Sequence, residues 1–355
     1  MMEAFVHQGS PARVVFGAGA RAGVAEEAAR LGRSRALVVA AEGARAEALA
    51  AETAGALGPL AAGVFAGARM HTPTEVTARA LAALGAAEAD LIVAIGGGSA
   101  IGLGKALAVR TDLDQIAIPT TYAGSEMTAL LGETEDGRKT TRTDPAIRPE
   151  TVIYDPELTL SLPPKTAAAS GLNALAHATE ALYARNRNPA TTLLSLEAVR
   201  AMARGLERTA AAPEDASARS EALYGAWLCA VALDQASVAL HHKLCHVLGG
   251  SFDLPHAETH AVVLPHAAAF NEAAVPELLA PAAEALGAAS AAAGLRSLSE
   301  RIGAPVSLRA LGMPEAGVDR AADLALQSPY WNPRPFDRDD IRGIIAAAWA
   351  GEPPA

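Results

Sequence analysis

Apolar positions in the first 160 residues form short runs, separated by stretches in which they recur with helical spacing. Five of these runs predict β-strands, at 35–40 (RALVVA), 61–67 (AAGVFAG), 90–99 (DLIVAIGGGS), 115–121 (QIAIPTT) and 151–156 (TVIYDP). Helical patterns lie between most of them, notably at 72–89, where Thr72 or Thr74 is expected to cap the helix. Strands that alternate with helices predict a mostly parallel sheet covered on both faces.

The second half of the chain has a different pattern. Segment 132–149 is polar and rich in turn residues, which predicts a loop or a short hairpin. After Pro163 and Pro164 the chain becomes rich in alanine and leucine at helical spacing, with no convincing strand. We therefore predict an α/β domain over 1–160 and an all-α domain over 161–355, with a small-molecule site in the cleft between them.

Composition excludes several classes of partner. The chain has 355 residues, of which 51% are hydrophobic, so it is long enough for a large core and two domains. Its formal net charge of -10 argues against nucleic acid or an anionic membrane surface, because both require a positive face. Two cysteines, no signal-like start and no apolar run of about 18 residues favour a cytoplasmic protein without a membrane partner.

Three consecutive glycines, Gly96, Gly97 and Gly98, follow the clearest strand, and Ser99 stands where the next helix is expected to begin. Glycines let the backbone approach a diphosphate closely, and free N–H groups at a helix start favour negative charge. The spacing fits neither GxGxxG nor a Walker A loop, which would need glycine at 101 or at 99. A tight turn that binds nothing is therefore the alternative to a phosphate site.

A second strand-end loop, IPTTYAGSEMT at 118–128, is rich in hydroxyl groups. In a parallel sheet such loops meet at the carboxyl edge, so the two loops are expected to flank one cofactor. This assigns cofactor contacts to Thr120, Thr121 and Ser125, and a substrate contact to Tyr122.

Six of the nine histidines lie within 240–266, far more than chance would place there. His242 and His246 are four apart on an expected helix, His256 follows Pro255, and His260 lies one turn further. Such a cluster suits two chemistries: a divalent metal site, or metal-free binding of an anionic carbonyl compound in which one imidazole supplies a proton. No function is predicted for the other histidines. His241 is expected to be structural, and no pattern around His266, His7 or His71 indicates a function.

Together these segments resemble the iron-containing alcohol dehydrogenase superfamily along essentially the whole chain. GGGSAIGLGK is similar to its diphosphate loop, IPTTYAGSEMT to its nicotinamide-side segment and HHKLCHVLGGSFDLPHAETH to its histidine stretch. The resemblance implies the dehydroquinate synthase-like fold, with an N-terminal dinucleotide-binding domain and a helical catalytic domain, NADH or NADPH as cofactor, and a homodimer. Metal-dependent members use one aspartate and three histidines as ligands, and the matching positions here are Asn173, His177, His242 and His256.

Asn173 is the departure from that pattern, because a neutral amide replaces an anionic carboxylate and lowers the affinity for a cation. The motifs GLNALAHATEALY, TVIYDPELTLSLPP and LPHAETHAVVLPHA resemble the metal-free branch that reduces maleylacetate, and often its chlorinated analogues, to 3-oxoadipate in the catabolism of aromatic compounds. No bound metal is therefore expected. A small dicarboxylate is the expected substrate, with contacts to Asn173, Lys243 and His260, and the predicted catalytic residues are His177, His242, His246 and His256.

Ala41 and Glu42 follow the strand that is expected to meet the adenosine ribose. Ala41 stands where related enzymes often carry an aspartate that excludes a 2′-phosphate, so Glu42 is the candidate for holding the ribose hydroxyl, which favours NADH. A solvated turn residue is the alternative for Glu42. Three rival functions also stay open: a metal-dependent alcohol or polyol dehydrogenase, a lyase of the dehydroquinate synthase type, and a non-catalytic ligand-binding protein.

Overall fold

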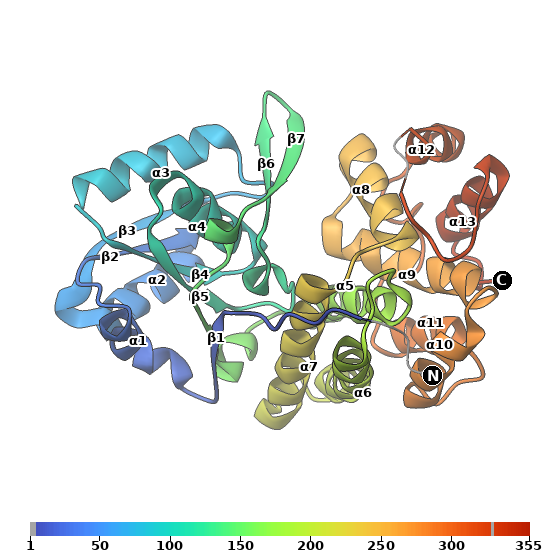
Figure 1. Cartoon of the computed structure of the whole chain (residues 1–355), viewed down its shortest axis with the longest axis horizontal. Coiled ribbons are helices and arrows are strands. Elements are labelled where there is room, and N and C mark those ends of the chain that lie inside the picture. Colours follow the sequence, from blue (N-terminus) through green and yellow to red (C-terminus); the bar gives the residue numbers. More distant parts are fainter. Residues whose placement is uncertain (1–4, 328–329) are drawn as a thin grey trace. The chain divides into compact units, whose positions relative to one another are not determined.

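The structure, a computed structural model, describes residues 5–327 and 330–355. Contacts divide the chain into two compact units (Figure 1). One is Ser10–Leu162, and the other contains Pro163–Ala355 together with residues 5–9. Each unit is built on its own pattern of apolar positions, so each is described by itself.

The Ser10–Leu162 unit contains a six-stranded sheet in the order β1-β8-β5-β4-β2-β3, and every neighbouring pair is parallel. The predicted α/β class and all five predicted strands are confirmed. The strands are β1 (Arg13–Phe16), β2 (Ala36–Ala41), β3 (Ala61–Ala68), β4 (Leu91–Gly96), β5 (Asp114–Pro119) and β8 (Thr151–Tyr154). The sequence pattern missed β1 because it is a four-residue edge strand whose two end residues are exposed.

Helices cover both faces of this sheet. On one face α1 (Val24–Arg30) and α2 (Ala44–Leu57) form a core with Val38 of β2. On the other face α3 (Thr74–Ala86) and α4 (Gly98–Thr111) form a core with Leu37 and Val39. Successive residues of β2 thus point to opposite faces, as period-2 geometry requires, and the strand is apolar throughout because both faces are buried.

Segment 132–149 was predicted to be a loop or a short hairpin, and it contains most of a hairpin. Strand β6 (Leu130–Glu135) pairs antiparallel with β7 (Arg138–Thr143). The prediction that Thr72 or Thr74 caps the helix at 72–89 is wrong, because Pro73 occupies the N-cap position of α3 and no side chain caps it. Thr72 instead has a left-handed backbone (φ 47°) and is buried. A Cβ added at Gly102 of α4 would lie 2.5 Å from its Oγ1 atom.

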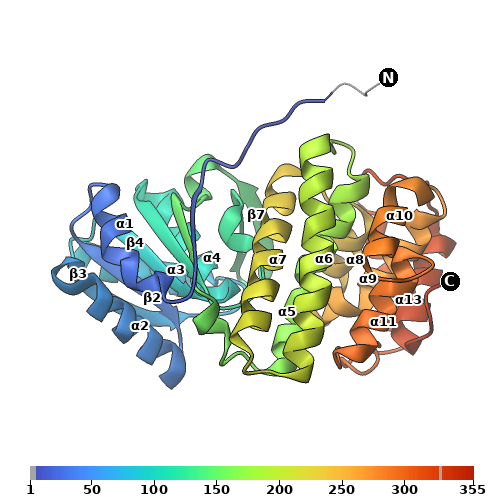
Figure 2. The same ribbon diagram turned by 90° about the horizontal axis from the view of Figure 1, so that it is seen from below.

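The Pro163–Ala355 unit is helical throughout its described residues, as predicted (Figure 2). Residues 167–183 of the first helix, α5, are all buried, which is the pattern of a central helix. Alanine and leucine dominate α5, so neighbouring helices can approach it from every side. The helices are α5 (Pro164–Tyr183), α6 (Pro189–Ala211), α7 (Ala216–Gln235), α8 (Leu240–Phe252), α9 (His256–Glu272), α10 (Pro276–Ala285), α11 (Ala291–Arg301), α12 (Gly317–Ala325) and α13 (Arg338–Ala350).

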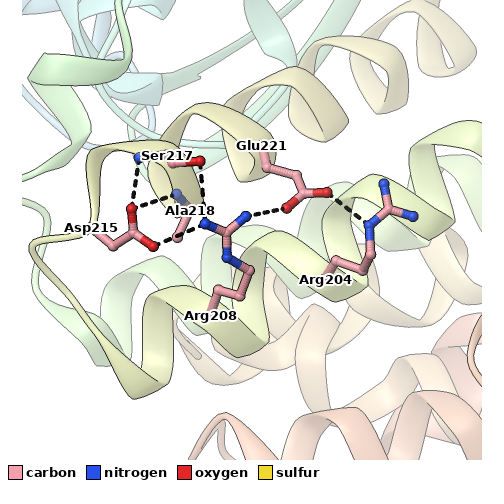
Figure 3. Close-up of polar contacts among 6 residues, drawn as sticks. All are labelled: Arg204, Arg208, Asp215, Ser217, Ala218 and Glu221. Carbon is pink, nitrogen blue, oxygen red and sulfur yellow. Dashed lines mark hydrogen bonds and ion pairs between the residues drawn. The ribbon is translucent and has the colours of Figure 1, made fainter.

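Helices α6 and α7 form a tightly packed pair. A Cβ at Gly205 of α6 would lie 2.4 Å from a backbone nitrogen of α7, so only glycine allows this approach. At the surface of the pair Arg208 lies between Asp215 and Glu221, bonding to each at 3.0 Å (Figure 3).

Within the described residues no single helix is long and apolar enough to span a membrane. Helices α7 and α8 pass that test of length and composition only together, as a pair bent by 98°.

Candidate active site

The candidate active site in the helical unit starts from one face of α5. Asn173, His177 and Glu180 follow each other at spacings of four and three residues, so their side chains share a face. All three side chains are buried. The remaining members come from the start of α8 and the start of α9, which bring the histidine-rich segment to the same place.

Glu180 organises this cluster and is not among the site residues predicted from the sequence. Its Oε1 atom accepts a hydrogen bond from the backbone N–H of His241 at 2.8 Å, and its Oε2 atom accepts one from Ala239 at 2.8 Å. These donors lie at the start of α8, which has no cap from its own sequence. A carboxylate from α5 therefore caps α8 and complements the positive end of its dipole.

The same carboxylate fixes His242. His242 Nδ1 lies 2.6 Å from Glu180 Oε2, and both side chains are almost fully buried. Because an ionised carboxylate only accepts hydrogen bonds, Nδ1 carries the proton and Nε2 is the free position of the ring. Nε2 is buried and has no hydrogen-bond partner among the described residues. This pairing of an oriented imidazole with an open nitrogen is the arrangement of a general acid or base.

His177 and Asn173 extend the site along α5. The His177 and His242 rings stack, with centroids 5.1 Å apart. Burial, and then the neighbouring His242 and His256, lowers the pKa of His177 well below its ordinary value. His177 is therefore neutral at neutral pH. His177 Nδ1 and Asn173 Oδ1 are buried without a partner among the described residues, so both atoms are available to a ligand.

The structure brings four more of the predicted residues to the edge of this cluster. His256 is exposed, and its ring packs against that of the fully buried His260 with centroids 4.4 Å apart. His246 is exposed, with its ring centroid 6.3 Å from that of His242. The half-buried Lys243 places Nζ 5.5 Å from the ring centroid of Tyr330. The catalytic and substrate-binding roles of all four stay predictions.

Behind His242 lies a second, fully buried group. His241 Nε2 and His260 Nδ1 are 2.9 Å apart, the distance of a hydrogen bond, and the Sγ atom of Cys245 lies 3.6 Å from His241 Nε2. The His241 and His242 rings are nearly perpendicular, with centroids 5.2 Å apart. Burial lowers the pKa of both His241 and His260 well below the ordinary value, so both are neutral.

The glycine turn follows β4 in the Ser10–Leu162 unit. Gly96 has φ +143°, a conformation that favours glycine, and α4 begins at Gly98, so Ser99 lies in its first turn as expected to within one residue. The N–H groups of that first turn have no intrahelical acceptor and point away from the helix. A Cβ at Gly98 would meet nothing within 4 Å, which leaves room for a diphosphate.

The hydroxyl-rich loop lies beside the glycine turn, as predicted. The backbone N–H of Thr120 donates to the carbonyl of Gly96 at 3.0 Å. A Cβ at Gly97 would lie 3.1 Å from Thr121 Cγ2, which is closer than ordinary van der Waals contact. Tyr122, the predicted substrate contact, is fully buried in this unit.

Lys105 of α4, a residue without a predicted role, is fully buried. Its Nζ atom donates to the backbone carbonyl of Ser125. It also donates to Ser125 Oγ at 3.2 Å and to Thr128 Oγ1 at 3.0 Å. Lys105 therefore ties the helix after the glycine turn to the second loop.

At the adenosine end of the predicted cofactor site, Glu42 forms an ion pair with Arg69. Glu42 Oε1 and Arg69 Nε are 2.9 Å apart and both side chains are about half exposed. Ala41 precedes Glu42 at the end of β2 and is half-buried. An acidic side chain, the type that can hold a ribose hydroxyl, and an arginine, the type that can bind a 2′-phosphate, are thus neighbours here.

The residues at the superfamily's metal positions do not fit a metal in this chain. Asn173 contributes a neutral amide instead of a carboxylate. Among the described residues, the one set of His, Cys, Asp or Glu side chains whose three ligand atoms lie within 4.8 Å of one another is His241, Cys245 and His260. That set contains none of the four superfamily positions.

Comparison with known families places the chain in a class. Residues 11–156 match the family described as iron-containing alcohol dehydrogenase. Residues 167–349 match the C-terminal part of the Fe-containing alcohol dehydrogenase family. Both units are therefore those of an iron-containing alcohol dehydrogenase, an oxidoreductase class, which supports the use of NAD(P)H.

Close relatives narrow this class. The maleylacetate reductase of Rhizobium sp. (strain MTP-10005) is 55% identical over 99% of this chain and 100% of its own length. Maleylacetate reductase 1 of Rhodococcus opacus is 50% identical over 99% of this chain and 98% of its own. The crystal structure of maleylacetate reductase from Agrobacterium tumefaciens superimposes with a TM-score of 0.96 at 55% identity, covering 99% of this chain and 100% of that one. The chain belongs to the maleylacetate reductases of the iron-containing alcohol dehydrogenase family.

Proposed function

We propose that the chain catalyses the NAD(P)H-dependent reduction of maleylacetate, and of its chlorinated analogues, to 3-oxoadipate. The relatives named maleylacetate reductase support this substrate. The observation that carries the proposed chemistry is the buried Glu180–His242 pair, with an open nitrogen on His242. The product belongs to the breakdown of aromatic compounds.

The substrate is a dicarboxylate with a ketone conjugated to an alkene. When bound, NAD(P)H supplies a hydride to the alkene carbon β to the ketone. The π electrons then move toward the ketone oxygen, and the carbon α to the ketone must take up a proton to complete the product. We assign this proton to His242, because Glu180 holds its ring through Nδ1 and leaves Nε2 open to carry the proton that is transferred.

His177 and Asn173 are proposed to bind the substrate as neutral groups. Burial keeps the His177 imidazole uncharged, so it offers one N–H and not a full positive charge. The amide of Asn173 can donate to a carboxylate, which an aspartate could do only when protonated. The exposed His246 and His256, with Lys243, are the groups left to supply positive charge.

For the cofactor, we propose that the first-turn N–H groups of Gly98 and Ser99 hold the diphosphate. Thr120, Thr121 and Ser125 are proposed to contact it from the second loop, which Lys105 holds in place. Glu42 is proposed to hold the adenosine ribose, which favours NADH. We further propose a homodimer located in the cytoplasm.

We propose that the reaction needs no metal, because the donor set at the superfamily's metal positions lacks its anionic member. Oriented hydrogen-bond donors can stabilise a developing negative charge on oxygen in place of a cation. The test follows NADH absorbance with maleylacetate before and after exhaustive chelation, with metal content measured in parallel. Unchanged activity in the metal-free protein is the expected result. Loss on chelation that zinc or iron restores would instead support a metal-dependent alcohol or polyol dehydrogenase.

A further inference from the structure

His241, Cys245 and His260 form a group that the proposed reduction does not explain. Their three side chains are at most 1% exposed, and their ligand atoms lie within 4.8 Å of one another. His260 Nε2 is a further buried nitrogen without a partner among the described residues. Two imidazoles and a thiol are the ligands that soft cations prefer.

The distances are close to those of a metal site. A cation about 2.3 Å from sulfur and about 2.0 Å from an imidazole nitrogen places the two ligand atoms about 3.5 Å apart. Cys245 Sγ and His241 Nε2 are already 3.6 Å apart. The two imidazole nitrogens, at 2.9 Å, share a hydrogen bond and would have to separate by about half an ångström to accept the same cation.

The donor set selects the kind of cation. Two imidazoles and one sulfur suit soft and borderline cations, and thiolate sulfur selects Cu(I) among them, so the site fits Cu(I) best. The thiol releases its proton when the cation binds.

The buried group adjoins an exposed imidazole. His256 is exposed, and its ring packs on that of His260 with centroids 4.4 Å apart.

We propose that His241, Cys245 and His260 form a Cu(I)-binding site whose occupation inhibits the enzyme. Cu(I) forms a bond to the Cys245 sulfur as the thiol proton leaves to solvent, and it breaks the hydrogen bond between His241 and His260. The rings of these two histidines lie 5.2 Å and 5.1 Å from that of His242, so their separation displaces the proposed proton donor. The inhibition, but not the binding, rests on the proposed reduction.

The first test measures binding without activity. The chelated, reduced protein is titrated anaerobically with Cu(I) in competition with a chromogenic Cu(I) chelator. One Cu(I) per chain is expected for the wild type and for Cys229→Ala, which removes the other buried thiol. Cys245→Ala is expected to weaken binding at least tenfold, and His260→Gln provides a second loss of ligand. Thermal unfolding of each variant checks that it is folded.

The second test follows NADH oxidation with maleylacetate at one Cu(I) per chain. At least a tenfold loss is expected for the wild type and Cys229→Ala, and less than a twofold loss for Cys245→Ala. Equal Cu(I) binding by Cys245→Ala and Cys229→Ala would overturn the site. Full occupation with unchanged NADH oxidation would overturn the inhibition. If maleylacetate is not a substrate, the binding test still decides the first claim.

Discussion

Replacing Glu180 by glutamine tests the arrangement around His242 most directly. The carboxylate accepts hydrogen bonds from the backbone of Ala239 and His241 and from His242 Nδ1. Glutamine has the same shape, but only its oxygen accepts. Its NH2 group must therefore either face an N–H of the helix start or donate to a proton-free His242 Nδ1, which moves the His242 proton to Nε2.

The size of the effect follows from these contacts. A hydrogen bond to a charged group contributes about 1.5–3 kcal/mol, so losing one such bond beside an opposed donor should lower the free energy of unfolding by about 2–3 kcal/mol. A general acid contributes roughly 10²–10⁴-fold to the rate. Because Glu180→Gln leaves the imidazole in place but in the wrong tautomer, kcat should fall by roughly 10²-fold or more.

The assay measures kcat and KM for maleylacetate and NADH. Because Glu180 is proposed to act on turnover through the orientation of His242, kcat should fall more than KM changes in Glu180→Gln. A purely structural role for Glu180 would lower the stability and leave kcat of the folded protein unchanged.

Glu221→Gln is the matched control. Glu221 lies in the surface network of Figure 3, where exposed ion pairs contribute at most about 1 kcal/mol. Its kinetics should stay within twofold of the wild type. A kcat of Glu180→Gln within threefold of the wild type would refute this role of Glu180.

Other substitutions test the remaining parts of the argument. Asn173→Asp should lower turnover of maleylacetate at least tenfold and raise the zinc content measured after dialysis against zinc. Unchanged turnover would show that the Asn173 amide does not bind the substrate. Glu42→Ala frees Arg69 and should raise kcat/KM for NADPH relative to NADH, a ratio that two cofactor titrations measure directly. Gly205→Ala should lower the free energy of unfolding by about 2–3 kcal/mol, because its Cβ would lie 2.4 Å from a backbone nitrogen. By contrast Gly55→Ala, with nothing within 4 Å of its Cβ, should raise that free energy by about 0.5–1 kcal/mol in denaturant titrations.

Much of the fold was predictable because the buried strands leave a strong signal. Strands β2, β4 and β5 are covered on both faces, so their residues are apolar in unbroken runs. The four-residue β1 lies at the sheet edge and has too few apolar positions to stand out. The cap of α3 was wrongly predicted because the hydroxyl of Thr72 is directed toward α4, a tertiary contact that local spacing does not encode.

The sequence identified several residues of the candidate site, but not the hydrogen bonds that connect them. Asn173, His177 and His242 could be found from their spacing and from the histidine density. Glu180 lies three residues after His177, which is the signal that could have identified it, but an acid on an expected helix face is more often solvated. The neutral state of His177 could not be predicted, because it follows from burial among neighbouring helices.

The burial of α5 has a consequence for how the protein loses activity on heating. Asn173, His177 and Glu180 project from a helix whose residues 167–183 are sheltered from water, so these amide hydrogens should exchange with solvent only when the whole helical unit opens. Catalytic competence and global folding are then a single cooperative property of that unit. Inactivation should coincide with melting and not precede it.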